Sequence, residues 1–186
     1  FRDSLYNRDS DNYISKLEEI PYRDSNAYKL TISLKNGKRR FSKILNTRPQ
    51  MSRISYCNEL YTVVSFACGG PCHSEVFVFT DENRPYEQYG YAQIVNDSPN
   101  IITHIKNEEF EKLLIHNFDN GTEIVVENPD INFMQYGQMD TMYVVGNELK
   151  IEYLTKNDKT RNKTISLQKI LKWIPAVLDL QSDTVI

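Results

Sequence analysis

The stretch LYTVVSFACGGPCHSEVFVFT, residues 60–80, decides the fold of this chain. Its two halves, residues 60–67 and 75–80, are apolar at most positions and show no regular alternation with polar side chains. Strands of this composition are covered on both faces. The Gly-Gly-Pro between the halves interrupts the apolar run and allows the chain to turn back. We therefore expect a buried β-hairpin at the centre of a sheet.

Outward from this hairpin, the chain continues as short segments with a period of two. Residues 28–35 alternate apolar and polar side chains, and the pair Asn36-Gly37 that follows favours a tight hairpin turn. Asp119-Asn120-Gly121 and Gly146-Asn147 predict two further turns. The other expected strands are residues 38–45, 89–95, 100–105, 112–118, 122–127, 142–145, 148–154 and 161–167. This pattern indicates an all-β fold of antiparallel hairpins, arranged as a sandwich, a barrel or a partial propeller.

Short helices are expected only at the two ends of the chain. Tyr13, Leu17 and Ile20 recur at helical spacing, and Pro21 would end that helix. A second short helix is expected after Ser166, which is placed to cap it. With 186 residues, the chain is expected to form one β-rich domain: a helical segment over 1–21, a β core over 28–167 and a C-terminal helix or tail over 168–186.

The composition limits the function classes. There are 22 Lys and Arg residues against 25 Asp and Glu residues, a net charge of −3. A dedicated nucleic-acid binder usually carries a strongly basic surface, so no nucleic-acid partner is expected. No apolar run approaches the roughly 20 residues of a membrane-spanning helix. The chain begins at Phe1 without an initiator Met, which is consistent with removal of a signal peptide.

The three cysteines indicate the cellular compartment in which the protein works. Cys68 and Cys72 lie at the two ends of the Gly-Gly-Pro turn, whereas Cys57 stands alone. The facing ends of two hairpin strands have the spacing that a disulfide needs, so we expect a Cys68–Cys72 bridge and a single unpaired thiol at Cys57. Such a bridge predicts a periplasmic or secreted protein. The alternative is three reduced cysteines in the cytosol.

Three other roles for the cysteine pair compete with a structural disulfide. A zinc site could use Cys68, Cys72 and His73, with His104 or His116 as the fourth ligand. Adjacent residues on a strand point to opposite faces, which weakens this reading. Covalent haem usually needs two residues between the cysteines, and a redox pair usually lies at a helix N-terminus. No metal and no cofactor are therefore expected.

The same segment, from Tyr61 to Cys72, resembles the strand–Cys-Gly-x-x-Cys–strand turn of small uncharacterised periplasmic β-proteins of Gram-negative bacteria. The resemblance covers some 25 residues. It implies export and a disulfide, in agreement with the argument from the cysteines. An immunity protein is among the roles that fit such a protein.

A catalytic constellation is not apparent in the sequence. Hydrolases that use a nucleophile need a base and an orienting group beside it. The chain contains no G-x-S-x-G, no phosphate-binding loop and no H-E-x-x-H. Cys57 lacks a flanking signature of a thiol nucleophile. We therefore expect a protein that is not an enzyme, and no catalytic residue is assigned.

Two segments are candidates for binding a protein partner. Residues 128–140 show no strand pattern yet contain Phe133, Met134, Tyr136 and Met139, residue types enriched at interfaces. The alternative is that this segment folds back and its aromatic side chains complete the core. The second candidate, the acidic segment 81–87, contains Arg84 and Tyr86.

Together these features predict a non-catalytic exported binding protein. The most specific hypothesis is an immunity or inhibitor protein that inserts loops into a secreted toxin, such as a cell-wall hydrolase. The first alternative is a thiol-dependent enzyme or redox protein that uses Cys57 or the Cys68/Cys72 pair. The second is a structural or carbohydrate-binding domain of the cell envelope.

Overall fold

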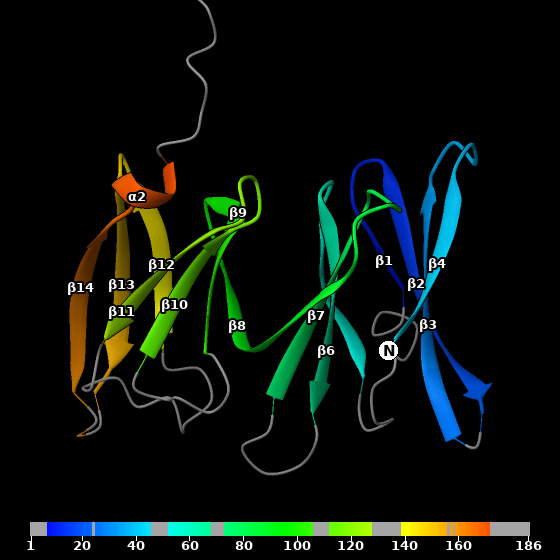
Figure 1. Ribbon diagram of the computed structural model, residues 1–186, viewed down its shortest axis with the longest axis horizontal. Coiled ribbons are helices and arrows are strands. Elements are labelled where there is room, and N and C mark those ends of the chain that lie inside the picture. Colours follow the sequence, from blue (N-terminus) through cyan, green and yellow to red (C-terminus); the bar gives the residue numbers. More distant parts are fainter. Residues whose placement is uncertain are drawn as a thin grey trace, which may run out of the picture. The chain divides into compact units, whose positions relative to one another are not determined.

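A computed structural model describes residues 7–23, 25–45, 52–67, 73–105, 112–127, 139–155, 157 and 159–171. For residues 22, 25, 67, 139, 140 and 171 it describes the backbone alone. The described part of the chain is mostly β-strand, which confirms the all-β prediction (Figure 1). The chain divides into two compact units, Phe1–Gln93 with His104–Phe110, and Ile94–Thr103 with Glu111–Ile186.

The strands belong to three antiparallel sheets, and none of the three is closed, so the described strands do not form a closed barrel. The hydrogen-bonded orders are β1-β2-β3-β4, β11-β10-β9-β8-β7-β6-β5 and β12-β13-β14. The strands are β1 (Asn7–Asp9), β2 (Tyr13–Tyr22), β3 (Ser25–Leu34), β4 (Arg40–Leu45), β5 (Arg53–Cys57), β6 (Tyr61–Ala67), β7 (His73–Phe79), β8 (Glu87–Val95), β9 (Ser98–Ile105), β10 (Lys112–Asn117), β11 (Thr122–Glu127), β12 (Met139–Val145), β13 (Glu148–Leu154) and β14 (Thr160–Ser166).

The expected N-terminal helix is wrong, because β1 and β2 occupy that segment. Along β2 the buried Ser15 and Leu17 alternate with exposed Ile14 and Lys16, a period of two. A spacing of four residues fits a strand as well as a helix, and the small polar Ser15 in the buried series conceals the alternation. Pairing of β2 with β3 over ten successive residue pairs then overrides the local helical signal.

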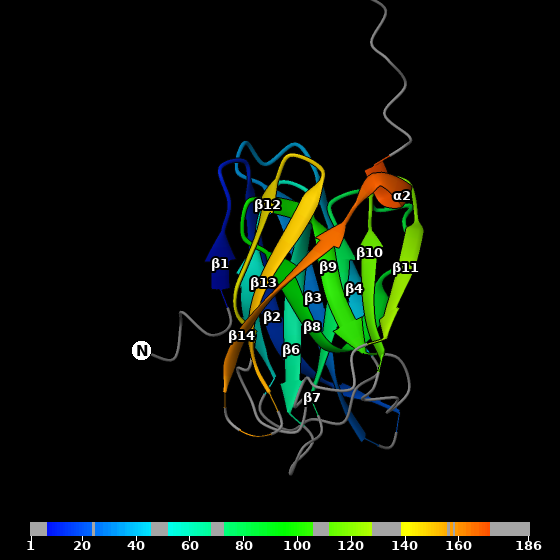
Figure 2. The ribbon, with the colours of Figure 1, turned by 90° about the vertical axis from the view of Figure 1, so that its left-hand side faces the viewer.

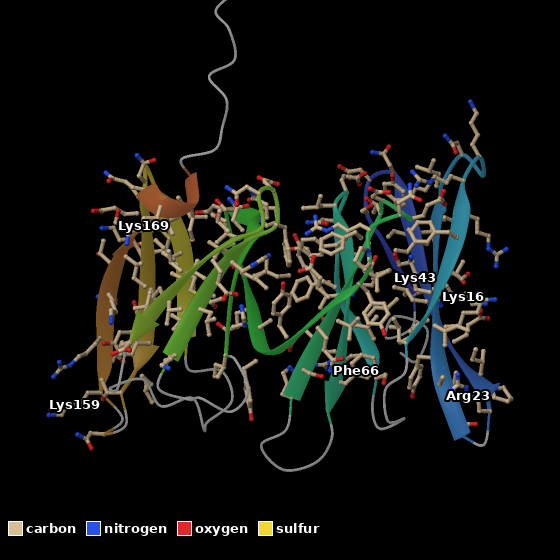
Figure 3. The ribbon with its side chains drawn as sticks, viewed as in Figure 1. Lys16, Arg23, Lys43, Phe66, Lys159 and Lys169 are labelled. Carbon is tan, nitrogen blue, oxygen red and sulfur yellow. The ribbon has the colours of Figure 1, made fainter. Side chains whose placement is uncertain are left out.

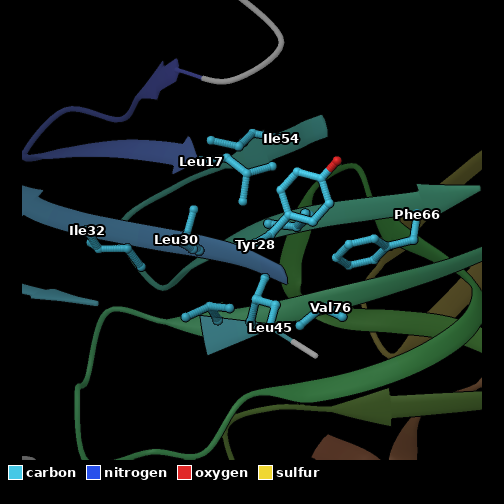
Figure 4. Packing of buried hydrophobic residues seen from close by; sticks show 10 residues of the cluster. Leu17, Tyr28, Leu30, Ile32, Leu45, Ile54, Phe66 and Val76 are labelled. Atoms are coloured by element: carbon cyan, nitrogen blue, oxygen red, sulfur yellow. The ribbon is translucent and has the colours of Figure 1, made fainter. Parts of the chain in front are cut away.

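The central hairpin has the predicted form. Strands β6 and β7 pair from Tyr61 with Phe79 to Ala67 with His73, and both faces of the hairpin are buried. On one face, Val64 and Val76 join a core shared with the first sheet. That core, drawn in Figure 4, contains Leu17, Tyr28, Leu30, Ile32, Leu45, Ile54, Val64, Phe66, Val76 and Val78. Within the first unit, two sheets therefore pack face to face, as in a β-sandwich.

The other face of the central hairpin is aromatic. The ring centroids of Tyr61 and Phe77 lie 5.2 Å apart, and those of Tyr61 and Phe79 lie 6.1 Å apart, both in edge-to-face geometry. Such pairs add about 0.5–1.5 kcal/mol each beyond the burial of their surface. Aromatic contacts therefore pack this second face of the hairpin.

The second unit contains the later hairpins. In β13, Leu149, Ile151 and Tyr153 are buried, as the alternation predicts. A four-residue helix, α2 (Gln168–Leu171), follows β14 and lies near β11 (Figure 2). The Asn120 side-chain amide donates to the carbonyl of Ile170 at 2.7 Å and ties α2 to the β10–β11 turn. The short C-terminal helix expected after Ser166 is not supported beyond these four residues, and residues 172–186 lie outside the described part of the chain.

Candidate binding site

Four loops at one end of the first unit are joined into a closed ring by hydrogen bonds and an ion pair. We call this set the loop ring, and it comprises residues 10–12, 35–39, 58–60 and 80–86. Each loop joins two antiparallel strands, so the sandwich brings all four to the same end. Loops held on such a scaffold commonly carry binding function.

The link between the first and third loops is centred on Glu59. Asn12 donates twice to this carboxylate, from its backbone N at 3.0 Å and from its side-chain amide at 2.8 Å. Desolvation by burial opposes ionisation of Glu59, but hydrogen bonds from Ser10 and Asn12 outweigh it and lower the pKa of the carboxyl group. The carboxylate is therefore ionised at neutral pH and acts as an anchor between loops 47 residues apart in sequence.

The third and fourth loops are joined through Thr80. Its hydroxyl donates to the carbonyl of Glu59 at 2.9 Å, and its backbone N donates to the carbonyl of Leu60 at 2.9 Å. Within the fourth loop, the Asp81 side chain accepts from the backbone N of Asn83 at 3.0 Å, an Asx turn that fixes the local backbone. The start of this loop therefore has a defined conformation.

The basic β3–β4 hairpin closes the ring on both sides. Lys35 donates from its backbone N to the carbonyl of Asn12 at 2.8 Å. Lys43, on β4, donates through its ammonium group to the carbonyl of Glu82 at 2.8 Å, and Nε of Arg39 lies 3.7 Å from the Glu82 carboxylate. Gly37 adopts φ +72° at the tip, as the Asn36-Gly37 signal predicts.

Both residues predicted to bind a partner in the segment 81–87 lie in the ring. The guanidinium of Arg84 lies 3.5 Å from the centroid of the Phe79 ring and donates to the carboxylate of Glu87 at 2.9 Å. Tyr89 also hydrogen-bonds Glu87 through its hydroxyl. Arg84 therefore supports the loop, whereas Tyr86, with 38% of its surface exposed, is available to a partner.

The remaining predicted binding residues lie elsewhere. Phe133, Met134 and Tyr136 lie outside the described residues, as does the side chain of Met139 at the start of β12. Their role stays a prediction.

The cysteines are described in part. Cys68 and Cys72 lie outside the described residues. Cys57 is a free thiol of intermediate burial. Its Sγ lies 3.7 Å from the hydroxyls of both Ser15 and Thr62, which hydrogen-bond each other at 2.6 Å. Both described partners of this thiol are therefore hydroxyl groups, which do not take up a thiol proton at neutral pH.

A charged pair lies at the opposite end of the central hairpin. His73 forms an ion pair with Glu75, whose side chain is only 8% exposed and also accepts from the backbone N of Ala92 at 2.8 Å. The hydrogen bond to Glu75 raises the pKa of His73, against the opposing effects of burial and of Arg53. His104 is buried against Tyr89, with ring centroids 4.5 Å apart.

Among the described residues, no group of three His, Cys, Asp or Glu side chains is placed to hold a metal ion. Over the same residues, no helix has the length and apolarity that crossing a membrane requires. Comparison of the chain with protein-family models, with curated proteins and with solved structures gives no match.

Sequence reasoning located Arg84 and Tyr86 but missed Glu59, Asn12 and Thr80. These three act through contacts between distant segments, and such contacts leave no local pattern. Asn58 offers a weak signal, because a turn residue directly before an apolar strand indicates a loop that joins it to an earlier strand.

Proposed function

We propose that the protein is a non-catalytic binding protein that engages a protein partner through the loop ring. The closed set of contacts among the four loops is the observation that carries this proposal. Binding normally requires that mobile side chains and loops become ordered, at about 0.5–1.5 kcal/mol for each immobilised side chain. Loops already fixed by Glu59, Thr80 and Glu82 avoid much of this cost.

The side chains that the ring presents suit a protein interface. Tyr and Arg are enriched among the residues that contribute most to binding energy. Tyr86 is exposed at the end of the fourth loop, and Lys38 is exposed at the hairpin tip of the second loop. An exposed aromatic side chain and an exposed cation on the same set of loops supply apolar contact area and charge complementarity.

The specific role we propose is that of an exported immunity or inhibitor protein acting on a secreted toxin such as a cell-wall hydrolase. Rigid loops that project from a β scaffold are suited to blocking an active-site cleft. The hydroxyl surroundings of Cys57 favour this role over a thiol-dependent enzyme. Export is supported by the pairing of Ala67 with His73, because Cys68 and Cys72 are the residues adjacent to this pair in the sequence and a disulfide between them would require an oxidising compartment.

The test is inhibition of peptidoglycan hydrolysis by purified hydrolases, beginning with toxin-like hydrolases encoded beside the gene for this chain. We expect stoichiometric inhibition by the wild-type protein and at least a tenfold loss of affinity in Tyr86→Ala. Tyr143→Ala is the matched control, because Tyr143 is exposed to a similar extent, 41%, but lies on β12 in the second unit.

Two results would contradict the proposal. In one, none of the hydrolases is inhibited and cells that express them gain no protection from the protein. In the other, Tyr86→Ala and Tyr143→Ala inhibit equally well, which would place the binding surface away from the loop ring.

A further inference from the structure

The outer face of the first sheet carries an ordered array of side chains that face away from the core. Strand pairing aligns residues across β2, β3 and β4 in three rows. The rows are Ile14–Ser33–Arg40, Lys16–Thr31–Ser42 and Glu18–Lys29–Ile44. Neighbouring strands are about 5 Å apart and alternate residues on one strand about 7 Å apart, so the nine positions form a compact patch. Its central residue, Thr31, is buried, with 3% of its surface accessible, and shares a hydrogen bond with Ser42 at 2.9 Å. We call this patch the outer basic face.

Three cations and one carboxylate make up the charges of these nine positions. Lys16, Lys29 and Arg40 come from three different strands, and Lys16 forms an ion pair with Glu18 at 2.7 Å. Lys16 lies on the side of the first sheet away from the core residue Phe66 (Figure 3). The patch therefore carries an excess of two positive charges. Lys16 lowers the pKa of Glu18 most, through a hydrogen bond and its charge, and Lys29 and Arg40 lower it further.

The positive charge of this region contrasts with the rest of the chain. Residues 7–45 contain nine Lys and Arg residues and five Asp and Glu residues, a net charge of +4. The whole chain has a net charge of −3, so the remaining residues together carry −7. Charge is therefore segregated along the sequence, and the outer basic face lies within the positive segment.

The need to keep a sheet edge from pairing with other chains does not account for all the cations of this face. Cations on an edge strand discourage pairing with other chains, and this explains Arg40 on β4. It does not explain Lys16 and Lys29, because β2 and β3 are interior strands of the four-stranded sheet. The same face also exposes apolar side chains, with Ile14 39% and Ile44 42% accessible. The face therefore combines three cations with two exposed apolar side chains, which offer a partner both charge complementarity and apolar contact area.

We propose that the outer basic face, continued by Lys38 and Arg39 at the hairpin tip, binds an acidic surface of the protein partner. This inference rests on the proposed function and adds the chemistry of the partner. Arg39 belongs to the loop ring and Arg40 to the outer basic face, so adjacent residues join the two surfaces. Complementary charge speeds association and makes binding sensitive to salt.

Poly-L-glutamate is the probe for this chemistry, because it carries the carboxylates of an acidic protein surface. In an NMR titration of the full chain at low salt, we expect amide shifts concentrated on the three rows of the face and on the hairpin tip. Raising the salt from 50 to 300 mM is expected to weaken binding at least tenfold. No binding at 50 mM salt, or shifts confined to the second unit, would overturn the proposal.

A pair of charge-matched variants tests the assignment to this face. The first replaces three cations of the face by glutamine: Lys16→Gln, Lys29→Gln and Arg40→Gln. The control replaces three exposed cations of the second unit: Lys159→Gln, Arg161→Gln and Lys169→Gln. We expect at least tenfold weaker binding of poly-L-glutamate in the first and less than twofold change in the second. If the first variant fails to fold, Lys16→Gln alone is expected to weaken binding twofold to fivefold.

Parallel titrations decide the class of partner. Tighter binding of heparin or duplex DNA than of poly-L-glutamate to the same residues would overturn an acidic protein partner in favour of another polyanion. Suppose that Tyr86→Ala weakens inhibition of a hydrolase but the three outer-face substitutions leave that inhibition unchanged. This result would overturn the present inference and leave the proposed function standing. Binding of poly-L-glutamate at the face without inhibition of any hydrolase would contradict the proposed function alone.

Discussion

Asn12 and Glu59, 47 residues apart, are joined by two hydrogen bonds that make the β1–β2 and β5–β6 loops one structural element. Both bonds end on the same carboxylate, and bonds to an ionised acceptor are stronger than neutral ones. The Glu59 backbone carbonyl in turn accepts from Thr80, so the same residue also holds the β7–β8 loop. Glu59 is therefore the residue on which the rigidity of the loop ring depends most.

We expect Glu59→Gln to loosen the loop ring while the sandwich core stays folded. A glutamine side chain retains one acceptor oxygen, so it can accept one of the two bonds from Asn12. Hydrogen exchange of the Asn12 amide is expected to accelerate at least fivefold, with little change at Leu30 in the core. Equal protection of the Asn12 amide in variant and wild type would show that this carboxylate does not order the ring.

Lowering the pH should loosen the loop ring of the wild-type protein, as Glu59→Gln does. The pKa of Glu59 is lower in the folded protein than in the unfolded chain, so its contribution is present above the unfolded pKa and is lost as the pH falls through the folded value. Exchange at Asn12, corrected for intrinsic pH dependence, should therefore rise below about pH 4. In Glu59→Gln this acid-dependent rise should be absent.

The pair of His73 and Glu75 predicts a stability that falls as the pH rises, opposite in sign to the effect of Glu59. The hydrogen bond to Glu75 raises the pKa of His73 above its unfolded value, which is near 6.5. The stabilisation that protonated His73 gains is then fully present below pH 6.5 and is lost as the pH rises through the folded pKa. Urea denaturation should therefore give a larger free energy of unfolding at pH 6 than at pH 8.5.

His73→Gln isolates this contribution, because it removes the titrating group and keeps a polar side chain. The difference in unfolding free energy between pH 6 and pH 8.5 should shrink in this variant. An unchanged difference would assign the pH dependence to other groups. His104→Gln does not serve as the control, since His104 is buried against Tyr89 and its replacement would disturb packing.

Much of the fold follows from the sequence, because most strand pairs are hairpins whose signals are local. The tight turns at Gly37, Gly121 and Gly146 all adopt a positive φ, as their Asn-Gly and Gly-Asn pairs indicate. Strand β2 was missed because Ser15 occupies a core position. Strand β5 was missed because a register shift between Ile54 and Tyr56 breaks its alternation. The loop ring was out of reach, since its bonds join segments that only the sheet packing brings together.

The shared core of the first unit predicts a sharp difference between two aliphatic residues on neighbouring strands. Leu30 on β3 is fully buried, whereas Ile44 on β4 is 42% exposed on the opposite face. Leu30→Ala is expected to lower the free energy of unfolding by about 3 kcal/mol, because it removes buried surface and leaves a cavity. Ile44→Ala should cost less than about 1 kcal/mol. Urea denaturation measures both.

If Leu30→Ala does not fold, Ile32→Val tests the same core with a cost of about 0.5–1.5 kcal/mol. A loss of stability in Ile44→Ala as large as in Leu30→Ala would mean that the outer face is covered in solution. That outcome would itself locate a buried interface on the outer basic face.

The strand pairing that ends at Ala67 and His73 predicts the state of the cysteines. Facing residues of antiparallel strands have Cα atoms about 4.5–5.5 Å apart, within the range that a disulfide accepts. Cys68 and Cys72 follow directly from that pair, so we expect them to be bridged in an oxidising compartment. Alkylation of the protein, unfolded without reductant, should therefore add one label, on Cys57, and Cys57→Ala should take none. Three labels would show that no disulfide is present and would remove the main support for export.

A bridge that closes so short a loop stabilises the protein by only about 2 kcal/mol in the chain-entropy treatment, so reduction should lower the unfolding free energy by no more than that. A much larger loss on reduction would mean that the turn organises the whole central hairpin.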